Sequence, residues 1–390
     1  MQYKTWRWVA GGVVLLLLLA IGWQLVGSRL ITPAAAQVDW GIARAINRPA
    51  AGNFQRATEV RPFVFPQDHG PHPEYQTEWW YYTGNLQSAD GQRWGYQLTF
   101  FRSGLSADAP ERESQWATSQ VYLAHFAVTD AAGQRFAANS QIARGGEINI
   151  AGAQAEPFHV FVKTWSAEGT GDNVRLRAAT DQVSIDLNLE SSKPATLQGD
   201  RGLSQKSNEV GNASYYYSLT RMITSGTISF AGKPTTVEGL SWMDHEWGTS
   251  ALSGEQVGWD WLGAQLSDNS EIMWGRLRRA DGSADYTNGS LTEADNSVIS
   301  LGNGDVQWTA LDTWRSSETG VEYPSRWRLQ APKIGLDVEL TPLIPNQELR
   351  VGLTYWEGAV RITGTRNGQP IDGYGYIELT GYGSGAQQAR

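Results

Sequence analysis

The sequence predicts an all-β protein made of two antiparallel barrels or sandwiches. Short runs such as 93–103 (RWGYQLTFFRS) and 119–130 (SQVYLAHFAVTD) alternate apolar with polar residues, which is typical of half-buried strands. The 390 residues include 43 glycines, 18 tryptophans and 15 tyrosines, a composition that disfavours long helices. The runs fall into two successive groups joined near residues 225–248, so we expect two related halves.

Each expected strand is bounded by turn-forming glycine, asparagine, aspartate or proline. In the first half the expected strands are 78–86, 93–103, 119–130, 158–167, 173–180, 183–191 and 215–222. In the second half they lie within 257–266, 271–283, 325–332, 335–343 and 356–382. The last stretch contains Asn367-Gly368, the pair of residues that most strongly predicts a two-residue hairpin turn.

The chain is too long for one ordinary domain and suits two. We predict a first domain at residues 60–248 and a second at 249–390, with a linker at 37–59 before them. Each half is long enough to bury a core of its own.

The N-terminal segment, residues 1–36, predicts export. Lys4 and Arg7 precede an apolar run from Trp8 to Val26, which is close to the ~20 residues that span a bilayer. The small residues before Gln37 resemble a signal cleavage site, so both a cleaved signal peptide and a retained membrane anchor stay open. We therefore expect the protein in the bacterial periplasm or cell envelope, with this segment as its contact with the inner membrane.

Composition narrows the possible chemistry. A formal net charge of −9 disfavours binding to nucleic acid. The absence of cysteine excludes disulfides, thiolate metal sites and thiol nucleophiles. The chain has no G-x-S-x-G elbow, phosphate loop or dinucleotide fingerprint, so we expect no cofactor. Any chemistry is then acid–base chemistry on an apolar substrate.

The first candidate site is the segment DHGPHPEYQTEWWYYTGN. Its residues His69, His72 and Glu78 carry the ligand types that suit zinc or iron, but Pro71 and Pro73 give a spacing that fits neither a helix nor a strand pair. An ordered loop or the lining of a pocket explains the segment better, and we predict no metal.

The strand that follows this loop combines a carboxylate with aromatic rings. In an extended chain Glu78, Trp80 and Tyr82 share one face. A buried carboxylate beside aromatic rings has a raised pKa and can act as an acid. We predict that these three residues bind a ligand together with His69 and His72.

The second candidate site is the segment SWMDHEWGTS. If it is extended, Trp242, Asp244 and Glu246 face one way, whereas His245 and Trp247 face the other. Either face offers groups for proton transfer in an aromatic pocket. The structural alternative is that the acids pair with arginines and that His245 is a core residue. We predict catalytic roles for Asp244, His245, Glu246 and Trp247, and a ligand contact for Trp242.

A third, weaker candidate is the segment GWDWLG. On a strand Asp260 faces away from its two neighbouring indoles. We predict that Trp259 and Asp260 contact the ligand.

Residues 65–86, 242–248 and 355–382 resemble the exported AttH-like and CrtC-like proteins, relatives of the carotenoid 1,2-hydratases with lipocalin-like domains. The resemblance covers roughly residues 60–383. It implies two lipocalin-like β-barrels packed together, with a pocket for an apolar ligand. Some relatives add water to a terminal isoprenoid double bond, and others resemble accessory proteins of ABC-type export systems.

The resemblance also implies residue roles. In the hydratases a DHEWG-like stretch carries a catalytic histidine and tryptophan, which correspond here to His245 and Trp247. The nearest match to a downstream aromatic-x-Asp pair of those enzymes is Trp259-Asp260, which lacks the spacer residue.

Three functions follow from these observations. The first is an exported module that binds a lipid or isoprenoid, beside the permease of an ABC transporter. The second is a hydratase that adds water to an isoprenoid double bond. The third is a structural or assembly factor in which the motif residues only tie the two barrels together.

Overall fold

The computed structural model describes residues 53–107, 118–146, 148–249, 252 and 255–383. The predicted signal or anchor at 1–36, and most of the predicted linker, lie outside these ranges. Within the described ranges no helix combines the length and the apolar character needed to cross a membrane.

The described residues form 23 strands and two short 3₁₀ helices. The elements that belong to the first sheet, in chain order, are η1 (Gln67–His69), β1 (Thr77–Ser88), β2 (Arg93–Gly104), β3 (Gln120–Asp130), β4 (Arg135–Arg144), β5 (Ala151–Gln154), β6 (Phe158–Val162), β7 (Trp165–Gly169), β8 (Asn173–Ala179), β9 (Val183–Ser191), β10 (Thr196–Leu197), β11 (Leu203–Gln205), β12 (Ala213–Phe230) and β13 (Lys233–Gly248). Those of the second sheet are β14 (Gln256–Leu266), β15 (Glu271–Arg279), β16 (Ala284–Thr292), β17 (Val298–Leu301), β18 (Gln307–Arg315), β19 (Glu322–Ala331), η2 (Pro332–Ile334), β20 (Leu336–Pro342), β21 (Glu348–Arg350), β22 (Thr354–Arg366) and β23 (Gln369–Leu379).

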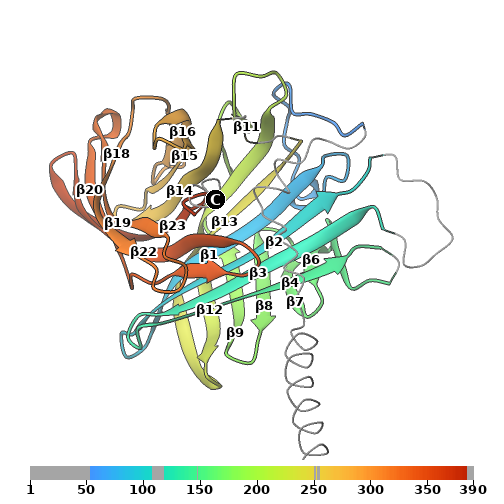
Figure 1. Cartoon of the computed structure of the whole chain (residues 1–390), viewed down its shortest axis with the longest axis horizontal. Coiled ribbons are helices and arrows are strands. Elements are labelled where there is room, and N and C mark those ends of the chain that lie inside the picture. The colour runs from blue at the N-terminus through green and yellow to red at the C-terminus, as the bar shows by residue number, and fades with distance from the viewer. Residues whose placement is uncertain (1–52, 108–117, 147, 250–251, 253–254, 384–390) are drawn as a thin grey trace, which may run out of the picture. The chain divides into compact units, whose positions relative to one another are not determined.

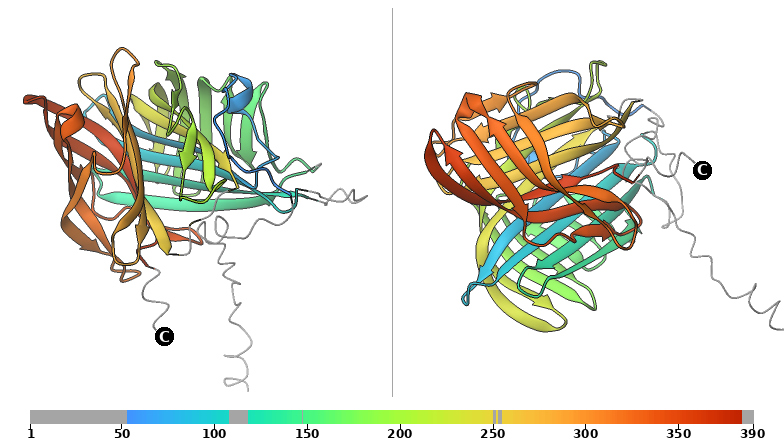
Figure 2. Two further views of the ribbon diagram at one scale, coloured as in Figure 1. Left: turned by 90° about the horizontal axis from the view of Figure 1, so that it is seen from above. Right: turned by 60° about the vertical axis from the view of Figure 1, so that its left-hand side comes forward.

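Among the described residues, two antiparallel sheets account for all of these strands. The first has 13 strands in the order β4-β3-β2-β1-β13-β12-β9-β8-β7-β6-β5, with β10 and β11 paired to β12. The second has ten strands in the order β17-β16-β15-β14-β23-β22-β20-β19-β18, with β21 paired to β22. Figure 1 and Figure 2 show the strands β14–β23, coloured from yellow to red, beside β1 and β13 of the first sheet.

Each sheet curves around a hydrophobic core of its own. Alternate residues of β8 are buried and exposed, as expected for a strand with one face on a core. The first core contains Trp80, Tyr82 and Trp247, and the second contains Trp327 and Trp356. The prediction of an all-β protein with two barrel-like antiparallel sheets is therefore confirmed. The first sheet ends at Gly248 and the second begins at Gln256, while the exact domain limits stay a prediction.

The outer face of the first sheet packs on the second sheet. The Asn85 Nδ2 group of β1 donates to the Gly375 carbonyl of β23 at 3.0 Å. The backbones of β2 and β22 approach closely, since a Cβ at Gly95 would lie 2.7 Å from the Ala359 Cβ. A glycine is thus required where these two strands meet.

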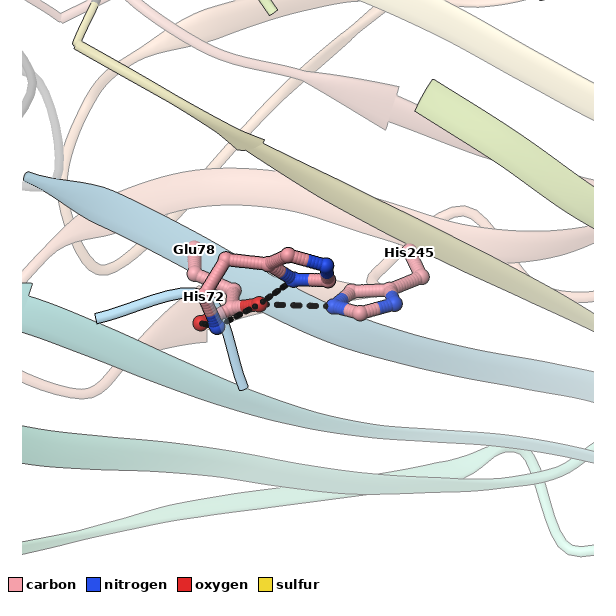
Figure 3. Close-up of side chains that lie close together, drawn as sticks. All are labelled: His72, Glu78 and His245. Carbon is pink, nitrogen blue, oxygen red and sulfur yellow. Dashed lines mark hydrogen bonds and ion pairs between the residues drawn. The ribbon is translucent and has the colours of Figure 1, made fainter. Parts of the chain in front are cut away.

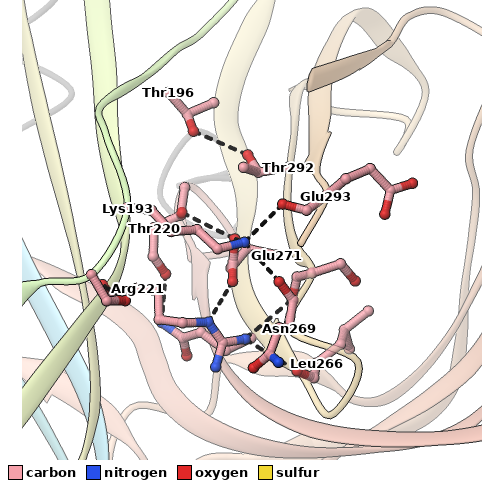
Figure 4. A network of polar contacts seen from close by, with 12 residues as sticks. Lys193, Thr196, Thr220, Arg221, Leu266, Asn269, Glu271, Thr292 and Glu293 are labelled. Carbon is pink, nitrogen blue, oxygen red and sulfur yellow. Dashed lines mark hydrogen bonds and ion pairs between the residues drawn. The ribbon is translucent and has the colours of Figure 1, made fainter. Parts of the chain in front are cut away.

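A buried ionic network also joins the two sheets (Figure 4). The Glu271 carboxylate of β15 binds the Lys193 ammonium at 2.9 Å and the Arg221 guanidinium of β12 at 2.5 Å. Lys193 also donates to the carbonyls of Asn269 and Glu293, at 2.7 and 2.8 Å. Glu271 is fully buried, so these contacts replace the water that its charge has lost.

We expect Lys193→Met to lower the free energy of unfolding by about 2 kcal/mol, because it removes charge-assisted hydrogen bonds from Glu271 and two carbonyls. Arg221 keeps the carboxylate paired, which limits the loss. Denaturant unfolding measures the difference. The exposed Lys233 is the matched control, and Lys233→Met should change stability by less than ~0.5 kcal/mol. Equal stability of both variants would contradict this role of the network.

Candidate functional site

A pocket lies between the packed faces of the two sheets. It encloses about 1090 Å³ of empty space, counting its open mouth. Indole and phenol rings form much of the wall, interrupted by carboxyl groups. The aromatic lining residues are Trp79, Tyr81, Phe101, Tyr216, Trp259, Trp261, Tyr286 and Tyr355. The acidic ones are Asp244, Glu246, Asp260, Glu357 and Glu378.

The first sheet contributes adjacent strands in register. In the antiparallel pair β1–β13, Tyr81 lies opposite Asp244 and Trp79 opposite Glu246. Opposite residues of a pair project from the same face, so these four side chains converge on the pocket. The predicted division of faces in the 241–250 segment is therefore seen in the structure.

The second sheet contributes a carboxylate pair. In the hairpin β22–β23, Glu357 lies directly opposite Glu378, and on the next strand Trp261 lies opposite Glu378. Two acids that share one face at this spacing cannot easily both ionise. The sequence analysis missed both residues. The Asn367-Gly368 turn was the signal that could have found them, since the register that it sets places position 357 opposite position 378.

Asp244 is poised to exchange a proton near neutral pH. Its carboxylate accepts hydrogen bonds from the Tyr216 hydroxyl (2.6 Å), the Ser218 hydroxyl (2.5 Å) and the Trp242 indole (2.7 Å). These donors stabilise the ionised form, but burial outweighs them and raises the pKa of Asp244 to about 7. Trp242, predicted as a ligand contact, thus acts by positioning this carboxylate.

Glu378 has a similar environment on the opposite wall. Its carboxylate accepts one hydrogen bond, from the Trp259 indole at 3.0 Å. Burial, together with the nearby charges of Asp244 and Glu246, raises the pKa of Glu378 to about 7. The pocket therefore holds two carboxyl groups, from separate sheets, that change protonation at neutral pH.

The other two predicted acids that line the pocket are ion-paired. Glu246 binds the Lys206 ammonium at 2.5 Å. Asp260 binds Arg276 at 2.7 Å and Arg278 at 3.3 Å. Both carboxylates are therefore committed to ion pairs with basic side chains.

The opposite faces of β1 and β13 point into the first barrel. His245 and Trp247 lie there, with Trp80 stacked 4.8 Å from the His245 ring. Tyr82 is buried in the same core. The residues predicted to form one site are thus divided by the sheet. Asp244, Glu246, Trp259 and Asp260 reach the pocket, whereas His69, His72, Glu78, Trp80, Tyr82, His245 and Trp247 are buried on the other side.

Glu78 is the centre of a buried polar cluster in that barrel (Figure 3). Its carboxylate accepts from His72 Nδ1 at 2.8 Å, from His245 Nε2 at 2.9 Å and from Arg102 Nε at 2.7 Å. The His72 ring also stacks on Trp247, with ring centroids 3.7 Å apart. Asp68 completes the cluster by accepting from His72 Nε2 at 3.1 Å.

The expectation that Glu78 has a raised pKa is wrong. Burial alone would raise it, but the Arg102 charge and the two imidazole donors hold the pKa of Glu78 well below its usual value. Two carboxylates at its ring nitrogens raise the pKa of His72 despite its burial. Burial lowers the pKa of His245 to about 4, so this ring is neutral at physiological pH.

His72, Glu78 and His245 also lie close enough to be considered as metal ligands, with ligand atoms within 4.8 Å of one another. The Arg102 guanidinium and the His72 backbone N–H already occupy the same carboxylate. A cation would have to displace that buried positive charge. The donor set therefore fits an ion-paired structural cluster better than a metal site.

Two packed barrels with a pocket between them define a two-barrel, lipocalin-like β protein. The chain belongs to the AttH-like family, whose model matches residues 56–382. A Nitrosomonas europaea protein solved as a candidate AttH is 35% identical, with a TM-score of 0.75 over 83% of this chain and 97% of that chain.

The family is related to a hydratase. Kievitone hydratase from Fusarium solani subsp. phaseoli is 23% identical over 223 residues, which cover 54% of this chain and 61% of that enzyme. The crystal structure of kievitone hydratase from Nectria haematococca shares the fold, with 15% identity and a TM-score of 0.63 over 86% of this chain and 99% of that chain. The predicted membership in an AttH-like, hydratase-related family is confirmed.

Proposed function

We propose that the protein is a hydratase-type enzyme that holds an apolar molecule in the pocket and adds water across a carbon–carbon double bond. The observation that carries this proposal is the position of Asp244 and Glu378. They face one aromatic pocket from separate sheets, and both have pKa values of about 7. The similarity to kievitone hydratase supports the same class of reaction.

The chemistry needs one acid and one base. A protonated carboxyl group gives its proton to one carbon of the double bond, and the other carbon takes the oxygen of water. The second carboxylate takes the proton that this water loses. The acid and the base have then exchanged roles, and a proton transfer between them restores the starting state. Two carboxyl groups with pKa values near 7 suit both directions.

The rings of Trp79 and Trp261 suit the apolar part of the substrate. Export, and association with the permease of an ABC transporter, are separate proposals that rest on residues 1–36 and on the family resemblance.

Incubation in heavy-oxygen water tests the reaction. Purified protein is extracted with organic solvent to identify any bound apolar molecule by mass spectrometry. That molecule, and a set of prenylated and conjugated apolar alkenes, are then incubated with fresh protein. Hydration appears as the gain of one heavy water. Stable binding without any gain would reduce the protein to a binding module, and no binding at all would remove the pocket from its function.

The pH dependence follows from the two raised pKa values. Turnover that needs one protonated and one ionised carboxyl group should be highest near pH 7 and should fall on both sides of it. The stability of the fold should depend on the same groups. A carboxyl group whose pKa is higher in the folded than in the unfolded state stabilises the fold below its unfolded pKa, and this stabilisation is lost as the pH rises through its folded pKa. The Glu378→Gln side chain does not titrate. We therefore expect the free energy of unfolding of this variant to increase relative to that of the wild type as the pH rises from 5 to 8, measured by denaturant unfolding. A constant difference across this range would contradict the raised pKa.

A further inference from the structure

One carboxyl group in the pocket makes no hydrogen bond of ordinary geometry with the described residues. Glu357 is only 1% exposed, and neither of its oxygens makes a hydrogen bond of ordinary geometry with the described residues. The hydroxyl of Tyr81, which lines the pocket from the opposite sheet, lies close enough to this carboxyl group to influence its pKa, but it too makes no hydrogen bond of ordinary geometry there. Buried polar atoms are nearly always hydrogen-bonded, so these groups point to a polar atom of a ligand.

The surroundings of Glu357 keep it neutral. No lysine, arginine or histidine among the described residues forms an ion pair with it. Burial, and then the charge of its cross-strand neighbour Glu378, raise the pKa of Glu357 well above its usual value. Tyr81 and Tyr355 lie beside it, and burial raises their pKa values as well, so they remain phenols. Tyr355 is held in place by His125 Nδ1, 2.8 Å from its hydroxyl oxygen.

A neutral carboxylic acid and a neutral phenol are both donors. The natural complement of two such donors is a single strong acceptor, a carbonyl oxygen. In a dry site this pair also stabilises the negative charge that develops on that oxygen when the compound reacts through an enolate. A cationic ligand would fit less well, because Glu357 would first have to lose its proton inside the protein.

We infer that Glu357 and Tyr81 bind the carbonyl oxygen of the substrate, which is therefore an apolar α,β-unsaturated carbonyl compound. This inference rests on the proposed hydration. Water loses a proton to a carboxylate, either Asp244 or Glu378, and its oxygen bonds to the β carbon. The π electrons move to the carbonyl oxygen, where the two donors stabilise the enolate. The α carbon then takes a proton from the other carboxyl group, and the carbonyl re-forms.

A matched pair of probes tests the donors. 2-Acetylnaphthalene carries a carbonyl group, and 2-ethylnaphthalene has the same shape without the oxygen. We expect the full chain to bind the ketone about tenfold more tightly than the hydrocarbon. The infrared C=O stretch of carbon-13-labelled ketone should be lower in the complex than in water, because dry acidic donors bond more strongly than water does.

Two variants locate the effect. Tyr81→Phe should remove most of the tenfold preference and raise the C=O frequency. Tyr82→Phe is the control, since its hydroxyl also lacks a partner but lies on the opposite face of β1, in the core. Glu357→Gln replaces the carboxylic acid by an amide N–H donor, so this variant should retain part of the preference for the ketone over the hydrocarbon.

The outcomes separate this inference from the proposed reaction. If both probes bind equally and the C=O stretch matches that in an apolar solvent, the inference is overturned while the pocket and the hydration stand. If the ketone binds as expected but no alkene gains heavy water, the carbonyl site stands and the hydration fails. If neither probe binds to the folded protein, both proposals fall.

Discussion

Asp244→Asn is expected to lower the rate of hydration by about 10²–10⁴-fold, the usual contribution of a general acid or base. Asparagine keeps the size of the side chain and still accepts a hydrogen bond from the Trp242 indole. Asparagine cannot give or take the proton, so turnover should be lost. Binding of the apolar substrate should persist, because the shape of the pocket is unchanged. The measurement is the rate of heavy-oxygen incorporation, with affinity measured separately.

Glu246→Gln provides the matched control for this prediction. Glu246 projects from the same face of β13 into the same pocket, but it is tied to Lys206. Its loss should change the rate by less than about tenfold, because its carboxylate is engaged by the Lys206 ammonium and has no step in the proposed reaction. A wild-type rate for Asp244→Asn together with an inactive Glu246→Gln would move the catalytic role to Glu246. A dependence on His245 alone would place the chemistry inside the first barrel.

Glu78→Gln is expected to lower the free energy of unfolding by about 3–5 kcal/mol. The substitution leaves the buried Arg102 guanidinium without its carboxylate and leaves His72 with Asp68 as its remaining acidic partner. Denaturant unfolding at pH 7 gives the difference. The exposed pair of Glu168 and Arg177 is the control, and Glu168→Gln should cost less than ~1 kcal/mol.

The pH dependence of this loss has a definite sign. The folded pKa of Glu78 lies well below the unfolded one, so its contribution is present above the unfolded pKa of about 4.3 and is lost as pH falls through the folded value. The difference between wild type and Glu78→Gln should therefore shrink in acid. A variant as stable as the wild type at pH 7 would show that the cluster does not hold the barrel together.

Local patterns predicted which side chains share a face. Alternation along 241–250 separated Asp244 and Glu246 from His245 and Trp247, and the structure shows that division. It could not show which face borders the pocket, because that depends on how the second sheet packs across β1. The hypothesis from the sequence therefore placed in one site residues that lie on opposite faces of the first sheet.

The protonation of Glu78 could not be predicted for a related reason. The sequence shows the aromatic neighbours at 79–82, but Arg102 lies 24 positions away and meets Glu78 only through the pairing of β1 with β2. One long-range cation reverses the expected effect of burial. The pairing of Glu357 with Glu378 could have been predicted, since the Asn367-Gly368 turn sets the register of their strands. Their burial could not, because it depends on the opposite sheet.

The strand β13 lets selection act on stability and on ligand choice independently. Its even-numbered residues Asp244 and Glu246 meet the ligand space, whereas its odd-numbered neighbours His245 and Trp247 hold the barrel. A substitution at an even-numbered position changes the pocket and leaves the barrel core nearly unchanged, and a substitution at an odd-numbered position does the reverse. Residues that line the pocket can therefore change without loss of barrel stability, whereas a one-residue shift in the register of β13 would exchange the two faces and disrupt both.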